Sequence, residues 1–155
     1  MTVFDRLLAL LDRHGVAYEV MRHAPVFTSE EAARVRGTPL ASGAKALVCK
    51  ADGRFVLLVM PADRRLDGRQ LRKAFGIRSL RFATRDEVVE LTSLVPGAIP
   101  PLGQLFGLVT YCDERLSGQA RINFNAGEHA VSVSLSSADY LAIEQPRLGR
   151  FAEPA

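Results

Sequence analysis

Several features that mark common classes of protein are missing from this sequence. It has two cysteines and three histidines, and none of them form a group with the spacing of zinc ligands. It contains no Gly-x-Ser-x-Gly elbow, phosphate-loop lysine motif or dinucleotide fingerprint. No apolar run approaches the ~20 residues that span a bilayer, and the amphipathic N-terminus, with Asp5 in its first turn, does not resemble a signal peptide. We therefore expect a cytoplasmic protein with no metal, no other cofactor and no membrane contact.

The scarce cysteines also limit the chemistry. Cys49 and Cys112 both fall in apolar, strand-like stretches, which predicts two buried free thiols in a reducing compartment rather than a disulfide. A nucleophilic pair of Cys112 with His129 is conceivable, but Cys112 lacks the electropositive setting that activates a thiol. If the protein is an enzyme, we expect it to use backbone donors and positioning more than a strong nucleophile.

Lysine is the scarcest cation, because 17 of the 20 basic residues are arginine and only three are lysine. The net charge of +3 is compatible with a polyanionic partner and does not require one. A dense basic stretch includes Arg69, Arg72 and Lys73. It has two interpretations, a solvated helix face or a patch that binds nucleic-acid phosphates.

Helical and strand patterns alternate along the chain without a linker or repeat, which predicts one domain over residues 1–155. The pattern indicates a mixed-sheet α/β or α+β fold. The polar tail from Gln145 is expected to be partly loose. Helices are expected at 4–11, 28–36, 67–76, 84–91 and 136–141. Strands are expected at 16–22, 44–50, 55–60, 79–83, 105–112, 121–124 and 130–135.

Local signals sharpen some of these boundaries. Thr28 with Glu31, and Thr84 with Glu87, have the spacing of capping boxes at helix starts. The Asp-Gly pair at 52–53 predicts a tight hairpin between two strands.

Three pieces of the chain predict the walls of one small-ligand pocket. The segment 96–103 holds three prolines and two glycines in eight residues, so its shape is constrained and its glycines allow close approach to the backbone. The turn 125–129 follows it. Lys45 precedes both and shares strand parity with Leu47 and Cys49, so its stem points toward an apolar face. Lys45 is either a strand-end lysine that extends to water or a cation aimed at an anion or an oxyanion.

The other candidates in these loops also have two interpretations. Gly97 and Gly127 either permit tight turns or cradle a ligand. His129 either has a structural role or acts as a hydrogen-bond donor or general base.

Taken together, three motifs resemble the YbaK/prolyl-tRNA-synthetase-associated editing domain family. They are Gly-Ala-Lys-Ala-Leu-Val-Cys-Lys at 43–50, Gly-Ala-Ile-Pro-Pro at 97–101 and Phe-Asn-Ala-Gly at 124–127. The resemblance covers nearly the whole chain. Ala-Asp-Tyr-Leu at 138–141 and Gln-Pro at 145–146 are similar to the stand-alone YeaK-type branch.

This resemblance implies a mixed, partly barrel-like sheet flanked by helices, and hydrolysis of the ester that joins a wrong amino acid to the 3′ end of a tRNA. Lys45 matches the family's important lysine, and Gly97 to Pro101 match its Gly-x-x-x-Pro loop. His129 falls where several members have a histidine, but the YeaK branch departs there. The implied catalytic residues are Lys45, Gly97 and Ala98. The substrate-binding candidates are Thr28, Leu47, Ile99, Pro100, Pro101, Phe124, Asn125, Gly127 and His129. The tRNA-binding candidates are Arg69, Arg72 and Lys73.

Two functions are therefore weighed. The first is a trans-editing aminoacyl-tRNA deacylase, with seryl and threonyl esters favoured and alanyl esters next. The alternative is a non-catalytic tRNA- or nucleotide-binding module that uses the same pocket. The expected partner is the 3′ acceptor end of an aminoacyl-tRNA, an aminoacyl-tRNA synthetase is a further candidate, and the protein is expected to be a monomer or weak dimer.

Overall fold

The larger sheet is mixed and has five strands in the order β5-β2-β3-β6-β9. The computed structural model describes all residues from 1 to 155. β2 and β3 form the predicted hairpin, and Asp52 and Gly53 at its tip both have positive φ, as a tight two-residue turn requires. β3 and β6 run parallel, which makes the sheet mixed. Its strands are β2 (Ala44–Ala51), β3 (Arg54–Pro61), β5 (Leu80–Phe82), β6 (Val109–Asp113) and β9 (Arg147–Gly149).

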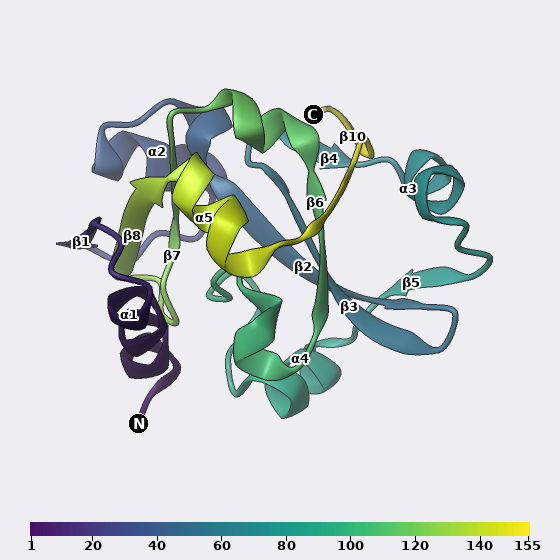
Figure 1. The fold of residues 1–155 in the computed structure, drawn as a ribbon, viewed down its shortest axis with the longest axis horizontal. Helices are drawn as coiled ribbons and strands as arrows, with labels where there is room; N and C mark the ends of the chain where they lie inside the picture. The colour runs from purple at the N-terminus through teal and green to yellow at the C-terminus, as the bar shows by residue number, and fades with distance from the viewer.

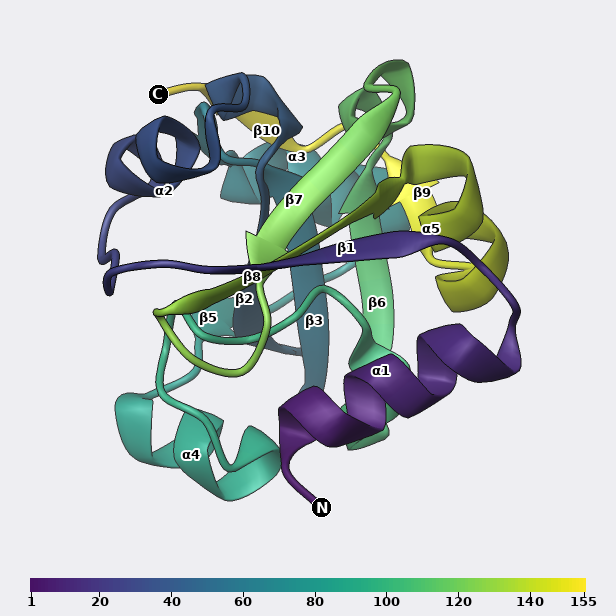
Figure 2. The same cartoon turned by 90° about the vertical axis from the view of Figure 1, so that its left-hand side faces the viewer.

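The second sheet is antiparallel and has the order β1-β8-β7. It crosses one face of the larger sheet (Figure 2). An isolated parallel bridge between Gly43 and Asn123 joins the two sheets at one corner, and they do not close into a barrel. A short antiparallel pair, β10 with β4, forms a third ladder and packs in the smaller core beside the larger sheet. These strands are β1 (Tyr18–Arg22), β4 (Arg64–Leu66), β7 (Arg121–Asn125), β8 (Val131–Ser136) and β10 (Ala152–Pro154).

Five α-helices surround the sheets (Figure 1), and most begin where a capping residue predicts. Asp67 caps α3, Ser136 caps α5, and Thr84 forms a full capping box with Glu87 at α4. None of the helices is long and apolar enough to cross a membrane. Their bounds are α1 (Val3–Arg13), α2 (Ser29–Arg36), α3 (Gly68–Phe75), α4 (Arg85–Thr92) and α5 (Ser137–Glu144).

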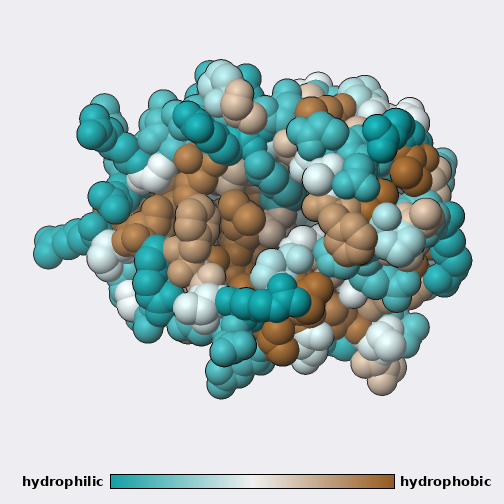
Figure 3. All heavy atoms as spheres, turned by 180° about the vertical axis from the view of Figure 1, so that it is seen from behind, coloured by the Kyte–Doolittle hydropathy of each residue, from teal (hydrophilic) through white to brown (hydrophobic).

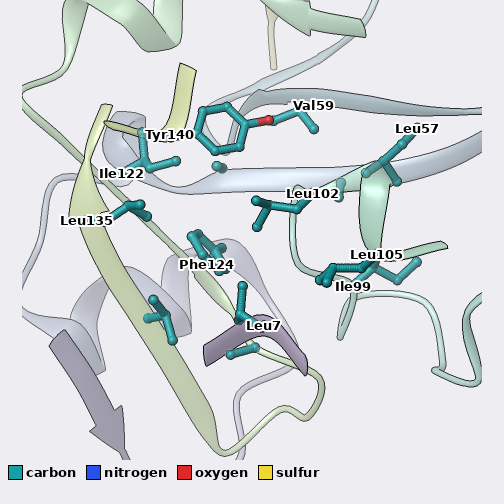
Figure 4. Packing of buried hydrophobic residues seen from close by; sticks show 14 of the residues in the cluster. Leu7, Leu57, Val59, Ile99, Leu102, Leu105, Ile122, Phe124, Leu135 and Tyr140 are labelled. Atoms are coloured by element: carbon teal, nitrogen blue, oxygen red, sulfur yellow. The ribbon is translucent and has the colours of Figure 1, made fainter. Parts of the chain in front are cut away.

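Strand alternation divides the buried residues between two faces of the larger sheet. Ala44, Ala46 and Val48 of β2 belong to the main core, whereas Cys49 and Ala51 belong to a smaller core on the opposite face. This is the expected result of a period of two. Figure 4 shows the main core, in which side chains of both sheets meet. The labelled residues from the sheets are Leu57, Val59, Ile122, Phe124 and Leu135.

Three local predictions were wrong. The residues before β6 form a short 3-10 helix, Gly103–Phe106, because the N–H groups of Leu105 and Leu108 donate to the nearby carbonyls of Leu102 and Gly103 instead of to a neighbouring strand. The C-terminal tail is not loose, since it forms β9 and β10 and buries Phe151 completely. Thr28 caps α2, but Glu31 accepts a hydrogen bond from the Thr28 hydroxyl instead of completing a capping box.

Candidate active site

A cavity of about 430 Å³ opens between α2, β2, the segment before Ile99 and the end of β7. Figure 2 shows α2 and α4 on the same side of the molecule, with β5 and β2 between them. Figure 3 faces this side, which is hollowed in its middle, with hydrophobic residues beside hydrophilic ones. The volume is within the ~300–1,000 Å³ of small-ligand sites. The three predicted walls all contribute to this one cavity.

The exposed edge of β2 forms one wall. β5 pairs with β2 only from Cys49 to Ala51, so β5 does not cover the first half of β2, which β7 approaches only at its start through the bridge of Gly43 to Asn123. The carbonyl of Val48 accepts a bond from Ala83 across this edge, and alternate residues of a strand direct their backbone groups to the same side. The N–H and C=O of Ala46 therefore face the cavity without a strand partner.

Lys45 lies in this edge and lines the cavity. It is half-buried, and its Nζ donates to the backbone carbonyl of Arg64. Burial lowers the pKa of the Lys45 ammonium, while the nearby carboxylates of Glu30 and Asp63 act in the opposite direction. Lys45 is thus neither fully solvated nor fully buried, and a role toward a bound anion stays a prediction.

The Pro/Gly segment forms a second wall through a tight turn. The N–H of Ala98 donates to the carbonyl of Val95 at 3.1 Å, and Gly97 has a φ of +90°. Pro96 and Gly97 thus occupy the two central positions of a type II turn, where the second requires a positive φ. Gly97 lines the cavity and its N–H has no acceptor in the protein. Ala98 is buried, does not line the cavity and has its amide engaged. This corrects the expectation that Ala98 offers a donor.

The turn after β7 is fastened to this segment. The side-chain amide of Asn125 donates to the carbonyl of Gly97 at 2.9 Å, and the N–H of Gly127 donates to the carbonyl of Ala98 at 2.9 Å. Gly127 has a φ of +97°, and a side chain there would meet Phe4 of α1. Gly127 shapes the turn but does not line the cavity.

His129 closes the cavity beside Gly97. Its ring centroid lies 4.9 Å from that of the exposed Phe27, and its Nδ1 is buried without a hydrogen-bond partner. A side chain on Gly97 would come within 3.2 Å of His129 Cε1. His129 therefore holds a buried polar atom without a partner beside the cavity, and it restricts the space around the turn.

Arg36, at the end of α2, is a cavity residue that the sequence did not reveal. Its Nε donates to Ser132 Oγ at 2.8 Å and its Nη2 to Asn125 Oδ1 at 2.9 Å. Burial lowers its pKa to about 10. A basic residue in the last turn of a helix is ordinarily solvated, so no local signal distinguished Arg36. Arg85, Thr38 and Asn123 are further cavity residues that sequence reasoning missed.

Eight of the twelve pocket candidates line this one cavity. They are Thr28, Lys45, Leu47, Gly97, Ile99, Phe124, Asn125 and His129. Pro100 and Pro101 are buried behind it, and the Pro101 carbonyl accepts a hydrogen bond from the hydroxyl of Tyr140 at 2.7 Å. Together with Ala98 and Gly127, they support the site without reaching its surface.

The basic candidates lie elsewhere. Arg69, Arg72 and Lys73 are exposed on α3 and line no part of the cavity. Figure 1 shows α3 and α2 toward opposite ends of the molecule's long axis. The two cysteines are also outside the cavity, and burial raises the pKa of each thiol to about 12. No group of three or more metal-ligating side chains comes together in the structure.

Comparison with known proteins identifies the class. The family model described as an aminoacyl-tRNA editing domain matches residues 23–143. The chain belongs to this family of editing domains.

Individual relatives agree with this assignment. The multifunctional Ser/Thr-tRNA deacylase ProXp-y of Escherichia coli K12 is 41% identical over 97% of this chain and 93% of its own length. The prolyl-tRNA editing protein ProX of Acetoanaerobium sticklandii is 27% identical over 90% of this chain and 88% of its own length. A crystal structure described as a candidate trans-editing enzyme for prolyl tRNA synthetase has a TM-score of 0.87 and 26% identity, and it covers 99% of this chain and 98% of the solved one.

Proposed function

We propose that this protein is a trans-editing deacylase that hydrolyses seryl- and threonyl-tRNA, with alanyl-tRNA as a weaker substrate. Membership of the editing family and the 41% identity to a Ser/Thr-tRNA deacylase support this reaction. We further propose that residues 1–155 act as one editing domain. An aminoacyl-tRNA substrate implies action in the cytoplasm, where charged tRNAs are used.

The single observation that carries the mechanism is that Lys45 and Gly97, whose N–H has no acceptor in the protein, line the same cavity from two of its walls. Water attacks the ester carbonyl carbon, the carbonyl oxygen gains the negative charge, and the bond to the ribose oxygen then breaks. The ribose oxygen takes up a proton, and the products are a free amino acid and an uncharged tRNA. Preorganised donors such as the Gly97 N–H stabilise the charge on the carbonyl oxygen.

The site needs no nucleophile from the protein. Both thiols are buried and hard to ionise, and an aminoacyl ester is already activated. Lys45 provides positive charge where the ester oxygens lie. The carbonyl of Ala46, on the open edge of β2, is placed to accept a hydrogen bond from the substrate α-ammonium group. The reaction then depends on positioning and on electrostatic stabilisation.

We assign His129 to selection of the amino acid. Its buried Nδ1 has no partner in the protein, and the hydroxyl of a seryl or threonyl group would satisfy it. A site that hydrogen-bonds a substrate hydroxyl discriminates strongly against an analogue without it, because the buried polar group is then left unpaired. Alanyl esters should therefore be hydrolysed more slowly than seryl esters.

The test is a deacylation panel with tRNAs charged with serine, threonine, alanine and cysteine. We expect turnover of seryl- and threonyl-tRNA above alanyl-tRNA, and a His129→Ala variant that narrows the serine-over-alanine ratio. Binding of tRNA without turnover of any ester would support the alternative of a non-catalytic binding module. An unchanged ratio of seryl-tRNA to alanyl-tRNA turnover in His129→Ala would show that His129 does not select the amino acid.

A further inference from the structure

A second cavity, of about 450 Å³, lies on the outward face of the three-stranded sheet. It is lined by outward-pointing residues of all three strands, including Met21 of β1, Ser134 of β8 and Arg121 of β7. Its volume is within the ~300–1,000 Å³ range of small-ligand sites. The cavity is thus large enough for a ligand of its own.

The two cavities are neighbours. Arg36, Thr38, Pro39 and Asn123 line both of them. These four residues form a common wall, which stands between the candidate active site and the outward sheet face. The two cavities therefore adjoin along these four residues, and a chain-like ligand long enough to occupy both would pass them.

The common wall has a cation without an anion. The four ion pairs of the protein do not include Arg36, its two hydrogen bonds go to neutral oxygens, and its Nη1 donates to no acceptor. The hydroxyl of Thr38 is also buried without a partner. A buried charge is costly unless it is paired. By contrast, Lys45 already has Glu30 and Asp63 nearby.

Beyond the wall the second cavity offers both charged and neutral hydrogen-bonding groups, together with the apolar side chain of Met21. Arg121 is held by Ser134, to which its Nε donates at 3.0 Å, and Met21 is 40% exposed. Glu19 also lines this cavity and pairs in register with Ser134, two residues further along β8 than the Ser132 that holds Arg36. The negative charge of Glu19 therefore lies away from Arg36, where it can accept from a hydroxyl or an amino group.

We propose that the second cavity binds the nucleotide that precedes the terminal adenosine of the substrate, and that the phosphodiester joining the two lies against Arg36 and Thr38. The proposal rests on the proposed function, which places the terminal adenosine and its ester in the first cavity. A phosphodiester supplies the anion that Arg36 lacks, and guanidinium groups bind phosphate oxygens through paired hydrogen bonds. The ribose and base then meet the polar groups and Met21 on the sheet face.

The test compares two minimal substrates, adenosine and cytidylyl-adenosine (CpA), each carrying a 3′ seryl ester. We expect the wild-type protein to hydrolyse the CpA ester with a kcat/KM at least about tenfold above that of the adenosine ester. Ser134→Tyr places a ring in the second cavity and should bring the ratio of the two kcat/KM values close to one. The matched control is Ser79→Tyr, an exposed serine that lines neither cavity and should leave the ratio unchanged.

Each outcome bears on the proposal. Equal kcat/KM values for the two esters in the wild-type protein would overturn it, and so would an unaltered ratio in a folded Ser134→Tyr variant. If Ser134→Tyr does not fold, Arg121→Ala is tested instead, because this variant removes a side chain that lines the second cavity and adds no bulk. If no ester is hydrolysed, the proposed function fails instead. In that case, calorimetry compares the affinity of the protein for uncharged CpA with its affinity for adenosine 5′-monophosphate, which lacks the preceding nucleoside. Equal affinities for the two ligands would overturn the proposal.

Discussion

The turn at Gly97 allows a quantitative test. Gly97 has a φ of +90°, and a Cβ there would lie 3.2 Å from His129 Cε1. A residue other than glycine in such a backbone region costs about 1–3 kcal/mol. One kcal/mol shifts the Tm of a domain of this size by about 2–4 °C. Gly97→Ala should therefore lower the Tm by roughly 2–12 °C.

Gly97→Ala should reduce the deacylation rate even at temperatures where the variant remains fully folded. It forces the turn to change or His129 to move, and either result displaces the Gly97 N–H from the ester oxygen. Loss of one oxyanion donor costs about 10²–10³ in kcat. The assay is deacylation of seryl-tRNA well below the Tm of the variant, so that unfolding does not contribute.

Two further variants separate the effect of backbone strain at Gly97 from the effect of its close contact with His129. Gly76→Ala is the matched control, because Gly76 has a φ of +65° with no atom within 4 Å of a new Cβ and lies outside the cavity. It should lower the Tm and preserve turnover. His129→Ala removes the close contact, so adding Gly97→Ala to it should cost less stability than in the wild type. Full turnover in Gly97→Ala would refute a backbone donor at this turn.

Three further predictions concern other parts of the molecule. Lys45→Ala should reduce seryl-tRNA turnover by about tenfold or more with an unchanged circular dichroism spectrum; near-normal turnover would contradict its role at the ester. Neutralising Arg69, Arg72 and Lys73 together should flatten the dependence of tRNA affinity on salt, measured by titration at several ionic strengths, and an identical slope would show that α3 is only a solvated face. Burial raises the pKa of Glu144 above its ordinary 4.5, against the opposing hydrogen bonds it accepts, so the folded state holds the proton more tightly. The contribution of Glu144 to stability therefore falls as pH rises above 4.5. In urea unfolding at several pH values, the Glu144→Gln variant should lose that part of the pH dependence. If the plots of unfolding free energy against pH run parallel for the variant and the wild type, this prediction is wrong.

Much of the local structure could be predicted because its causes are local. A cap such as Thr84 with Glu87 joins residues three positions apart, and the Asp-Gly hairpin at 52–53 depends on the backbone preferences of two residues. Strand parity in β2 likewise follows from the chain itself, so Lys45 was placed on the correct face. The family and its activity followed from the three motifs, and the comparisons confirm both.

The tertiary structure decided what depends on residues far apart in the sequence. Arg36 is held by Asn125 and Ser132, which are 89 and 96 positions away, so no spacing rule indicated that a helix-end arginine would become a half-buried cation between two cavities. Only the folded loops show that the N–H of Ala98 is hydrogen-bonded to Val95 and that Gly127 packs against α1. The tail is ordered because the carboxylate of Asp113 accepts from the N–H groups of Phe151 and Ala152. Local sequence patterns thus determined most of the helices and strands and the family, while long-range packing determined which groups line the cavity and which are already hydrogen-bonded.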